Sequence, residues 1–308
     1  MVLKIGTRAS KLALWQANWV AKRLQDAGAS TEIITIETKG DKILSKSIAK
    51  IGSKGVFTEE LEQDLEIGRI DIAVHSAKDM QSELPPNLQI IAFTEREQSH
   101  DVVVSFNKRI KLERLDTKYL IGTSSTRRVA MLRHYYGNVR TQDVRGNLQT
   151  RFKKMEEGHY DALILAYAGV KRMGFEETIC QNLSPNTFTP AVGQGSMAIE
   201  AHESLSDEKR LFVRTCLNDE KTEMCIIAER TFLQALDGGC SVPVFGLATL
   251  KDDIISLQAG VISLDGKNLL RHTLEAPTNK AVSLGKEVAN ALLGLGGDEI
   301  LRKIRERK

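Results

Sequence analysis

Residues 119–166 read YLIGTSSTRRVAMLRHYYGNVRTQDVRGNLQTRFKKMEEGHYDALILA, and this stretch decides the fold class. Short apolar runs at 119–122, near Val139 and at 162–166 predict strands. The segments between these runs carry helical patterns, the first of which ends at Tyr136. Strands that alternate with helices in this way favour an α/β domain with a mainly parallel sheet.

The same alternation extends toward the N-terminus. Ser10 is expected to cap a first helix that ends at Gly28. The other elements predicted in this half are strands at 2–6, 31–38, 70–75 and 88–93 and a helix at 57–67. The polar segment 94–100 is expected to be a crossing or hinge between two such α/β series.

The C-terminal third has a different pattern. Residues 190–195 (PAVGQG) form a glycine-rich break, and helical patterns are expected from about Ser196 to Leu236. Three strands in a meander are predicted next, followed by helices from about Lys280; the strands are 242–250, 254–262 and 269–274. This part of the chain is therefore expected to form a small α+β domain.

Length and composition limit the class of protein. At 308 residues the chain exceeds the ~250–300 residues at which single cores stop growing, which predicts two or three domains. No apolar run approaches the ~20 residues that span a bilayer, and the first residues already predict a strand where a targeting peptide would lie. The four cysteines have no metal-type or redox-type spacing, which is typical of reduced cysteines in a cytoplasmic protein: Cys180, Cys216, Cys225 and Cys240.

Positive charge is concentrated in one window of the chain. Between Ile121 and Lys154 there are eight basic residues and one acidic residue, so this window carries +7 in a chain whose total is +3. The near-neutral total argues against a dedicated nucleic-acid binder. A local excess that is rich in arginine and set among Gly, Ser, Thr and Asn predicts a binding site for an anion.

Two strand–turn–helix junctions in this window carry the same chemistry. Arg127 and Arg128 follow Gly122 and the hydroxyl side chains of Thr123 and Ser124, where free backbone N–H groups and the helix dipole favour an anion. The second junction holds Arg145, Gly146 and Asn147, with Arg151 one helical turn further on. A capped helix with solvated arginines is the alternative for either junction alone, but the repetition favours a shared site. A P-loop is excluded because the chain has no GxxxxGK[ST] motif.

Further charged groups follow strands in the first half. Residues 75–79 (HSAKD) place Lys78 and Asp79 within one turn at the carboxyl end of a predicted strand, where α/β sheets bind ligands. Neighbouring cations would keep Asp79 ionised, so that it could stabilise a developing positive charge or move a proton. A capped helix with a surface ion pair is the simpler alternative. Arg8 lies between the first strand and the first helix, and Lys54 adds a cation next to a glycine.

Cys240 follows two glycines at the entry to the C-terminal domain. Glycines allow another group to approach closely, and nearby cations could lower the pKa of a thiol there. Such a thiol could be a nucleophile or a covalent anchor, although a lone cysteine in a loop is usually inert.

Taken together, these segments resemble the porphobilinogen deaminase family from end to end and in order. No single motif is specific, but the ordered set is. The motifs are GTRASKLALWQA (6–17), TKGD (38–41), GSKGVF (52–57), DIAVHSAKD (71–79), GTSSTRR (122–128), VRGNLQTR (144–151), YDALILAYAGVKRMG (160–174), PAVGQG (190–195), AER (228–230) and DGGCSVP (237–243).

The resemblance implies three domains, of which the first two look like type II periplasmic binding proteins with the active site in the cleft between them. The implied domains are 1–96 plus 196–216, 101–190, and an α+β domain at 220–308 that carries the cysteine loop. The resemblance also implies a dipyrromethane cofactor joined by a thioether to Cys240. By the same resemblance, four porphobilinogen units would be added to this primer, each with loss of ammonia, and the linear tetrapyrrole hydroxymethylbilane would be released by hydrolysis.

Roles for individual residues follow from the same resemblance. Asp79 matches the catalytic aspartate, which would stabilise the cation that forms when ammonia leaves. Matches to cofactor-binding positions are Ser76, Lys78, Asp79, Thr123, Ser124, Arg127, Arg128, Arg145, Gly146 and Cys240. Matches to substrate-binding positions are Arg8, Ser10, Gln16, Lys54, Arg145, Arg151, Arg172 and Gln194. No metal, nucleic-acid or membrane partner is expected, and the cysteines are typical of a cytoplasmic protein; the resemblance to the family implies a monomer.

Five positions depart from the pattern of the family. Ala77 and Gln81 stand where Met and Pro are usual, and Glu59 stands where Lys is common. Tyr167 occupies a normally small position, and Ser241 replaces Gln after the cysteine. None of them removes a charged group assigned to the chemistry. A non-catalytic protein that binds an anionic small molecule would also explain the arginines, but it gives no role to Asp79 or Cys240.

Overall fold

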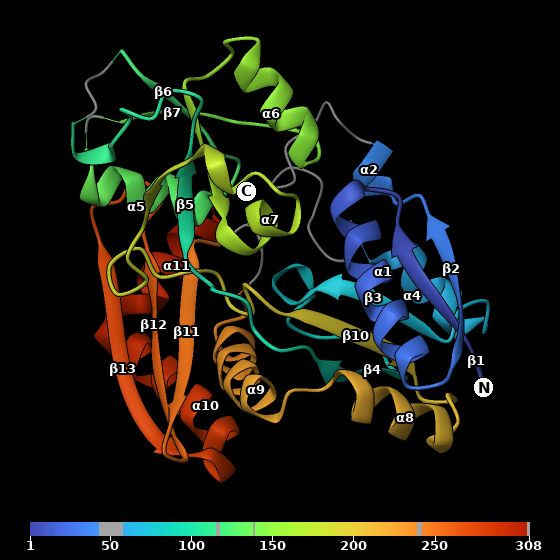
Figure 1. Ribbon diagram of the computed structural model, residues 1–308. Helices are drawn as coiled ribbons and strands as arrows, with labels where there is room; N and C mark the ends of the chain where they lie inside the picture. The colour runs from blue at the N-terminus through green and yellow to red at the C-terminus, as the bar shows by residue number, and fades with distance from the viewer. Residues whose placement is uncertain (43–57, 115–117, 138, 239–241, 307–308) are drawn as a thin grey trace. The chain divides into compact units, whose positions relative to one another are not determined.

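The fold is taken from a computed structural model that describes residues 1–42, 58–114, 118–137, 139–238 and 242–306 (Figure 1). The chain divides into two compact units. Unit 1 comprises Met1–Glu97 and Gly195–Glu223, and unit 2 comprises Gln98–Gln194 and Met224–Lys308. Each unit is therefore built from two separate stretches of the chain.

Unit 1 contains a five-stranded sheet covered by helices on both faces. In sheet order its strands are β2 (Ser30–Ile36), β1 (Val2–Arg8), β3 (Ile72–Ser76), β10 (Met197–His202) and β4 (Leu88–Phe93). The α-helices in the described part of unit 1 are α1 (Lys11–Asp26), α2 (Lys39–Lys42), α4 (Glu59–Glu66) and α8 (Asp207–Leu217). Strands β2, β1 and β3 are parallel, whereas β10 runs antiparallel to both of its neighbours.

Apolar side chains from the helices close the two faces of this sheet. On one face Val20 and Leu24 of α1 and Val213 of α8 pack in a core with Leu3 and Ile5. On the other face the buried residues are Ile36, Leu61, Leu65, Ile70, Ala73 and Leu88, so α4 covers this side. Burial of each such leucine or isoleucine stabilises the fold by roughly 1.5–3 kcal/mol.

Strand β10 corrects one prediction from the sequence. A helical pattern was expected from Ser196 onward, but Met197–His202 is a strand, and the first helix after the break begins at Asp207. The first five residues of β10 are buried because the strand lies between β3 and β4 with both faces covered. A short apolar run of this kind has no alternation that would distinguish it from a buried helix.

The first part of unit 2 repeats the topology of unit 1. In sheet order its strands are β7 (Arg140–Gln142), β6 (Leu120–Gly122), β8 (Ala162–Ala166), β5 (Asp101–Val104) and β9 (Ile179–Asn182). The α-helices of this part are α5 (Thr126–Tyr135), α6 (Leu148–Glu156) and α7 (Tyr167–Arg172). As in unit 1, the first three strands are parallel, and the fourth runs antiparallel to both neighbours. Strands β5 and β9 were not predicted.

The rest of unit 2 is an antiparallel sheet with helices. Its strands, in order, are β11 (Val244–Lys251), β12 (Ile254–Ile262) and β13 (Leu269–Pro277). Its main helices are α9 (Glu220–Ala235), which enters unit 2 at Met224, α10 (Ala281–Leu292) and α11 (Asp298–Arg305). The buried carboxylate of Glu229 on α9 accepts hydrogen bonds from Gly193 N at 2.7 Å and Ala248 N at 2.8 Å. Glu229 thereby joins the PAVGQG segment to this sheet.

The predicted fold class is confirmed. The two larger sheets share one strand order, which is the arrangement that the likeness to type II periplasmic binding proteins implied, and a small α+β part follows. The predicted cleft and the predicted three-domain boundaries stay predictions. Within the part of the chain that the structure describes, no helix is both long enough and apolar enough to cross a bilayer.

Candidate functional site

In unit 1, polar side chains gather where two neighbouring parallel strands end. Arg8 is the last residue of β1 and Ser76 is the last residue of β3. The register pairs Gly6 with Ala73, so Arg8 lies near the level of His75 at the same edge of the sheet. The carboxyl edge of an α/β sheet is where ligands bind, as the sequence predicted for this segment.

Asp79 lies on a single 3-10 turn, η1 (Ala77–Asp79), that directly follows β3. Ala77 is buried and its N–H donates to Ser196 O at 3.0 Å, and Met80 N donates to Ala77 O at 3.3 Å. The Asp79 side chain is exposed. The turn is therefore anchored by its backbone and by buried neighbours, while the carboxylate faces solvent.

Three of the other predicted residues support this edge. Gln16 is 2% exposed, and its Nε2 donates to Ser76 Oγ at 3.0 Å. Ser10 caps α1, where its Oγ accepts from Ala13 N at 3.3 Å. Gln16 and Ser10 thus fix the frame around Ser76, and Lys78 next to Asp79 is partly exposed.

In unit 2, a second group of predicted residues lies between β6 and α5. Thr123 is 3% exposed, and its Oγ1 accepts from Ser125 N at 3.4 Å. Ser125, not Thr123 or Ser124, is the N-cap of α5 and accepts from Arg128 N at 3.4 Å. Ser124 Oγ donates to Val144 O and accepts from Val144 N at 3.0 Å. Ser124 therefore joins this turn to the loop that carries Arg145.

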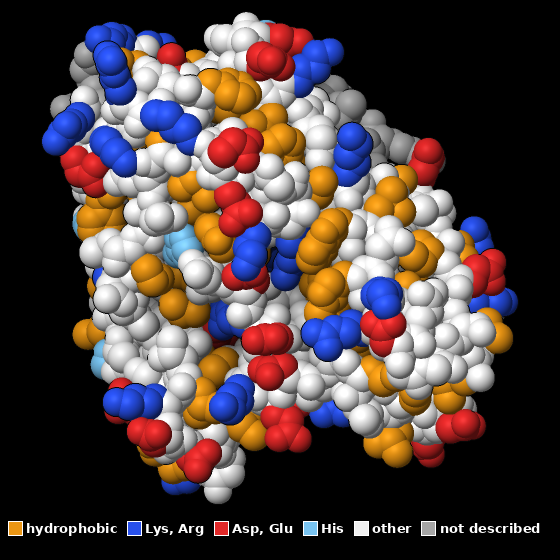
Figure 2. All heavy atoms as spheres, viewed as in Figure 1, with side chains coloured by type: hydrophobic (Ala, Val, Ile, Leu, Met, Phe, Trp, Pro, Cys, Tyr) orange, Lys and Arg blue, Asp and Glu red, His pale blue; other side chains and the backbone are white. Residues whose placement is uncertain are grey.

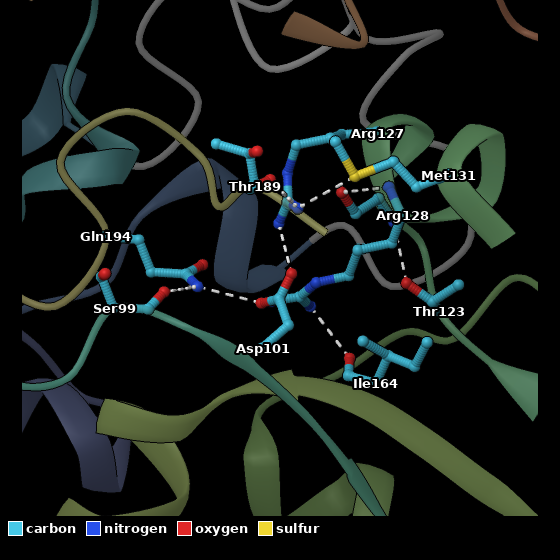
Figure 3. Close-up of polar contacts among 10 residues, drawn as sticks. Ser99, Asp101, Thr123, Arg127, Arg128, Met131, Ile164, Thr189 and Gln194 are labelled. Atoms are coloured by element: carbon cyan, nitrogen blue, oxygen red, sulfur yellow. Dashed lines mark hydrogen bonds and ion pairs between the residues drawn. The ribbon is translucent and has the colours of Figure 1, made fainter. Parts of the chain in front are cut away.

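Arg127 and Arg128 share one buried carboxylate (Figure 3). Arg127 Nη2 lies 2.8 Å from Asp101 Oδ2, and Arg128 Nη2 lies 2.7 Å from Asp101 Oδ1. The backbone oxygens of Thr189 and Ile164 each accept a second bond, from Arg127 Nη1 and Arg128 Nη1 respectively, both at 2.9 Å. The side chains of the two arginines are 5% and 9% exposed, so a capped helix with solvated arginines is excluded.

The electrostatics of this cluster leave one positive charge in excess. Burial alone would raise the pKa of Asp101, but Arg127 and Arg128 hold it well below its usual range. Burial lowers the pKa of the Arg127 guanidinium, and Asp101 opposes that shift. Two guanidinium ions facing one carboxylate sum to +1 in a site from which water is nearly excluded.

One donor in the cluster is unsatisfied. Arg128 Nε is buried and has no hydrogen-bond partner among the described residues. An unpaired buried donor on a charged group is costly, so this atom and the excess charge together favour an added anion. Gln194, which was predicted as a substrate contact, is 1% exposed, and its Nε2 donates to Asp101 Oδ1 at 2.9 Å and Ser99 O at 2.6 Å.

Asp101 was missed in the sequence analysis although a signal was present. It is the first residue of the strand Asp101–Val104. The three residues that follow it are valines, and all four residues are buried. A carboxylate in such a strand needs charged partners, because burial of an unpaired charge is very unfavourable. The two adjacent arginines of the window are the partners that this carboxylate required.

The second junction of the window presents its arginines differently. Gly146 has φ +105°, a region that favours glycine, and Arg151 Nε donates to Gly146 O at 2.9 Å. Arg145 Nε lies 3.5 Å from Asp143 Oδ2, and the Arg145 side chain is 18% exposed. Asn147 caps α6 by accepting from Thr150 N at 3.0 Å. Arg145 and Arg151 are therefore less buried than Arg127 and Arg128.

The remaining predicted positions fall in other places. Arg172 is the last residue of α7 and is partly buried. Tyr167, at a position that is normally small, stacks on His100 with ring centroids 4.8 Å apart. Figure 2 shows basic side chains gathered over the end of unit 2 that carries β6 and β7. Lys54 and Cys240 lie outside the residues that the structure describes.

The fold and these side chains define an α/β protein that presents an exposed carboxylate at the edge of one sheet and partly uncompensated arginines at the other. Comparison with known proteins identifies the family. Residues 3–210 match the model of the porphobilinogen deaminase dipyrromethane cofactor binding domain, and residues 223–294 match that of the porphobilinogen deaminase C-terminal domain. The chain belongs to the porphobilinogen deaminase family.

Relatives of full length agree with this assignment. A porphobilinogen deaminase of Desulfosudis oleivorans is 48% identical over 100% of this chain and 99% of the relative. A porphobilinogen deaminase of Cytophaga hutchinsonii is 52% identical over 99% of this chain and 97% of the relative. The predicted family, the predicted transferase activity and the predicted dipyrromethane cofactor are thereby confirmed.

Proposed function

We propose that this chain joins four porphobilinogen molecules head to tail by means of Asp79, on a dipyrromethane primer bound through a thioether to Cys240. The product is hydroxymethylbilane, released by hydrolysis. The buried cluster of Arg127, Arg128 and Asp101 is the observation that carries the proposal. Its excess charge and the unpaired Arg128 Nε fit a ligand that bears carboxylates, and each pyrrole ring of the primer bears an acetate and a propionate.

The exposed carboxylate of Asp79 suits the chemical step. Loss of ammonia from porphobilinogen leaves a cation that is delocalised over the pyrrole nitrogen. A carboxylate fixed next to that N–H stabilises the charge as it develops, and it can accept the proton that is lost after the new bond forms. The primer supplies a free α-carbon as the nucleophile. The short backbone-anchored turn keeps Asp79 in place through successive additions.

The arginines have a separate task, which is to hold carboxylates without trapping the product. A charge-assisted hydrogen bond contributes roughly 1.5–3 kcal/mol, so several weak contacts must share the growing chain. Residues proposed to bind the cofactor, besides Cys240, Arg127 and Arg128, are Ser76, Lys78, Asp79, Thr123, Ser124, Arg145 and Gly146. Residues proposed to bind substrate are Arg8, Ser10, Gln16, Lys54, Arg145, Arg151, Arg172 and Gln194. Some buried members of this set would support the site through other residues and not by direct contact with substrate, as Gln194 does through its hydrogen bond to Asp101.

We also propose that the protein is a monomer and that it is located in the cytoplasm.

The cofactor assignment is tested by intact-mass measurement of the purified protein. Wild type should carry a covalent adduct of two pyrrole units, and Cys240→Ser should lack it. Cys216→Ser is the matched control, because Cys216 is a partly buried cysteine of α8 and should leave the adduct in place. An adduct that persists in Cys240→Ser, or a wild type that turns over substrate with no adduct, contradicts the assignment.

The role of Asp79 is tested by Asp79→Asn, which removes the negative charge and keeps the shape of the side chain. Because a positioned acid–base group contributes about 10²–10⁴-fold, kcat should fall by at least about 100-fold. Asp26→Asn is the control, since Asp26 makes an exposed ion pair with Lys22 and should leave kcat unchanged. Turnover of Asp79→Asn within a few-fold of wild type would remove Asp79 from the mechanism.

A further inference from the structure

The turn that carries Asp79 is followed by a polar side chain tied to another helix. Gln81 Nε2 donates to Glu62 Oε1 at 2.9 Å and to Thr58 Oγ1 at 3.2 Å. Glu62 belongs to α4, and Thr58 is the N-cap residue of that helix. Thus two residues after Asp79 the chain is held to the start of α4 through its side chain.

Glu62 is a firmly placed acceptor for this contact. It is 6% exposed and lies on the side of the sheet that α4 covers, with His75 of β3 and Glu200 of β10 in the same buried layer. His75 Nε2 lies 3.1 Å from Glu200 Oε2, and their side chains are 4% and 0% exposed. Burial raises the pKa of Glu62, and the amide of Gln81 is among the groups that oppose this shift. A carboxyl in such surroundings has little freedom to leave its partner.

Asp79 depends on the backbone for its position. Among the described residues its carboxylate makes no hydrogen bond or ion pair, so no side-chain contact orients it. On the N-terminal side the turn is fixed by Ala77 N, which donates to Ser196 O at 3.0 Å. On the C-terminal side Met80 is buried, and the side chain of the next residue, Gln81, attaches the chain to Glu62 and Thr58. These two contacts bracket Lys78 and Asp79.

We propose that Gln81 is a positioning residue for this enzyme: held by Glu62 and Thr58, it fixes the turn that presents the Asp79 carboxylate. The proposal rests on the catalytic role proposed for Asp79. Where the family usually has proline, a ring would restrict the backbone at this position. In this chain the backbone is restricted instead by the side-chain amide of Gln81, which donates hydrogen bonds to Glu62 and Thr58. The substitution therefore replaces one kind of local constraint with another.

Three variants of the Gln81–Glu62 contact test the proposal. Gln81→Ala should lower kcat about five- to tenfold with KM within about twofold of wild type, since the loss of the hydrogen bonds to Glu62 and Thr58 loosens the turn but removes no substrate contact. Gln81→Glu places a carboxylate against Glu62 and should lower kcat further. The double variant Gln81→Glu with Glu62→Gln exchanges donor and acceptor, and should restore kcat to within about twofold of wild type.

Two controls separate positioning from general stability. Gln63→Ala changes the exposed neighbour of Glu62 on the same helix and should leave kcat unchanged. All rates are divided by the fraction of protein that carries the primer, measured by intact mass, so that a poorly folded fraction cannot imitate a slow enzyme. Purely structural roles would lower that fraction and leave the corrected kcat as in wild type.

The outcomes are distinct. Corrected kcat values of Gln81→Ala and Gln81→Glu equal to wild type, while Asp79→Asn is inactive, would overturn the role of Gln81 and leave the proposed function intact. No recovery in the double variant would overturn it as well. Near-normal turnover of Asp79→Asn would overturn both. Reduced kcat in the single variants with recovery in the double variant supports the proposal.

Discussion

The two five-stranded sheets share one strand order but carry opposite chemistry at their edges. In unit 1 the chemical group is a single carboxylate, Asp79, exposed on a short turn. In unit 2 the groups are Arg127 and Arg128, buried in α5 and paired with Asp101 inside the fold. The same topology therefore carries an exposed carboxylate in one sheet and two buried guanidinium groups in the other.

The roles proposed for these groups account for this difference. A carboxylate that stabilises a transient cation must reach the reacting atoms, so it lies outside the packed core. Arginines that hold a permanent polyanion bind more strongly where water is excluded, but burial of two cations requires an internal carboxylate. Asp101 offsets only one of the two charges. The remaining positive charge is the one that we propose binds a carboxylate of the primer.

Substitution of each carboxylate by asparagine tests the comparison most directly. The variant at Asp101 should show the largest loss of stability. Asp101→Asn leaves two buried guanidinium ions without a counter-charge and should lower the free energy of unfolding by about 3–5 kcal/mol. Asp79→Asn changes an exposed side chain and should stay within about 0.5 kcal/mol. Urea denaturation of both variants measures these values.

Activity should show the reverse order when it is corrected for folded, primed enzyme. Asp79→Asn should lose turnover and keep its stability, whereas Asp101→Asn should lose stability and lower the fraction of protein that carries the primer. Equal losses of stability in the two variants would contradict the contrast between an exposed and a buried carboxylate.

Acid titration sharpens the same contrast. The pKa of Asp101 is held well below its usual range, so its contribution to stability is present above the unfolded pKa of about 3.9 and is lost as the pH falls toward the folded value. Below about pH 4 the stability of wild type should fall more steeply than that of Asp101→Asn, by up to about 1.4 kcal/mol per pH unit. If the free energies of unfolding of wild type and Asp101→Asn fall in parallel with pH, Asp101 does not contribute to stability in this way.

The sequence predicted most strand–helix alternation and the positions of the polar turns. Glycines and caps marked these turns, as Ser10 and Asn147 show. The helix predicted from Ser196 was wrong, since β10 is a strand, and strand β5 was not predicted. Both strands are short and buried, so they have no alternation of apolar and polar residues that would identify them. Arg127 was predicted as an anion contact, and its pairing with Asp101 was not predicted, because that contact spans 26 residues and only the folded sheet creates it.

Gly146 provides the next largest expected effect, on the loop between β7 and α6. Its φ of +105° is unfavourable for any side chain, and a Cβ atom would lie 2.7 Å from Thr150 Cγ2. Gly146→Ala should therefore lower the free energy of unfolding by about 1–3 kcal/mol. Gly137→Ala is the control, since its nearest neighbour would be Arg133 O at 3.9 Å. Equal effects would show that the loop accommodates a side chain.

The smallest expected effect on stability is at Asn147, the N-cap of α6, which lies between the two less buried arginines Arg145 and Arg151. Asn147→Ala removes the oxygen that accepts from Thr150 N at 3.0 Å and should lower the free energy of unfolding by about 1 kcal/mol. Asn147→Asp keeps an acceptor and should stay close to wild type. Because the loop that α6 follows carries Arg145, the alanine variant should also raise KM for porphobilinogen while kcat changes little. A loss of kcat with unchanged KM would assign this loop to the chemical step, and the contrast between a catalytic edge in unit 1 and a binding edge in unit 2 would then fail.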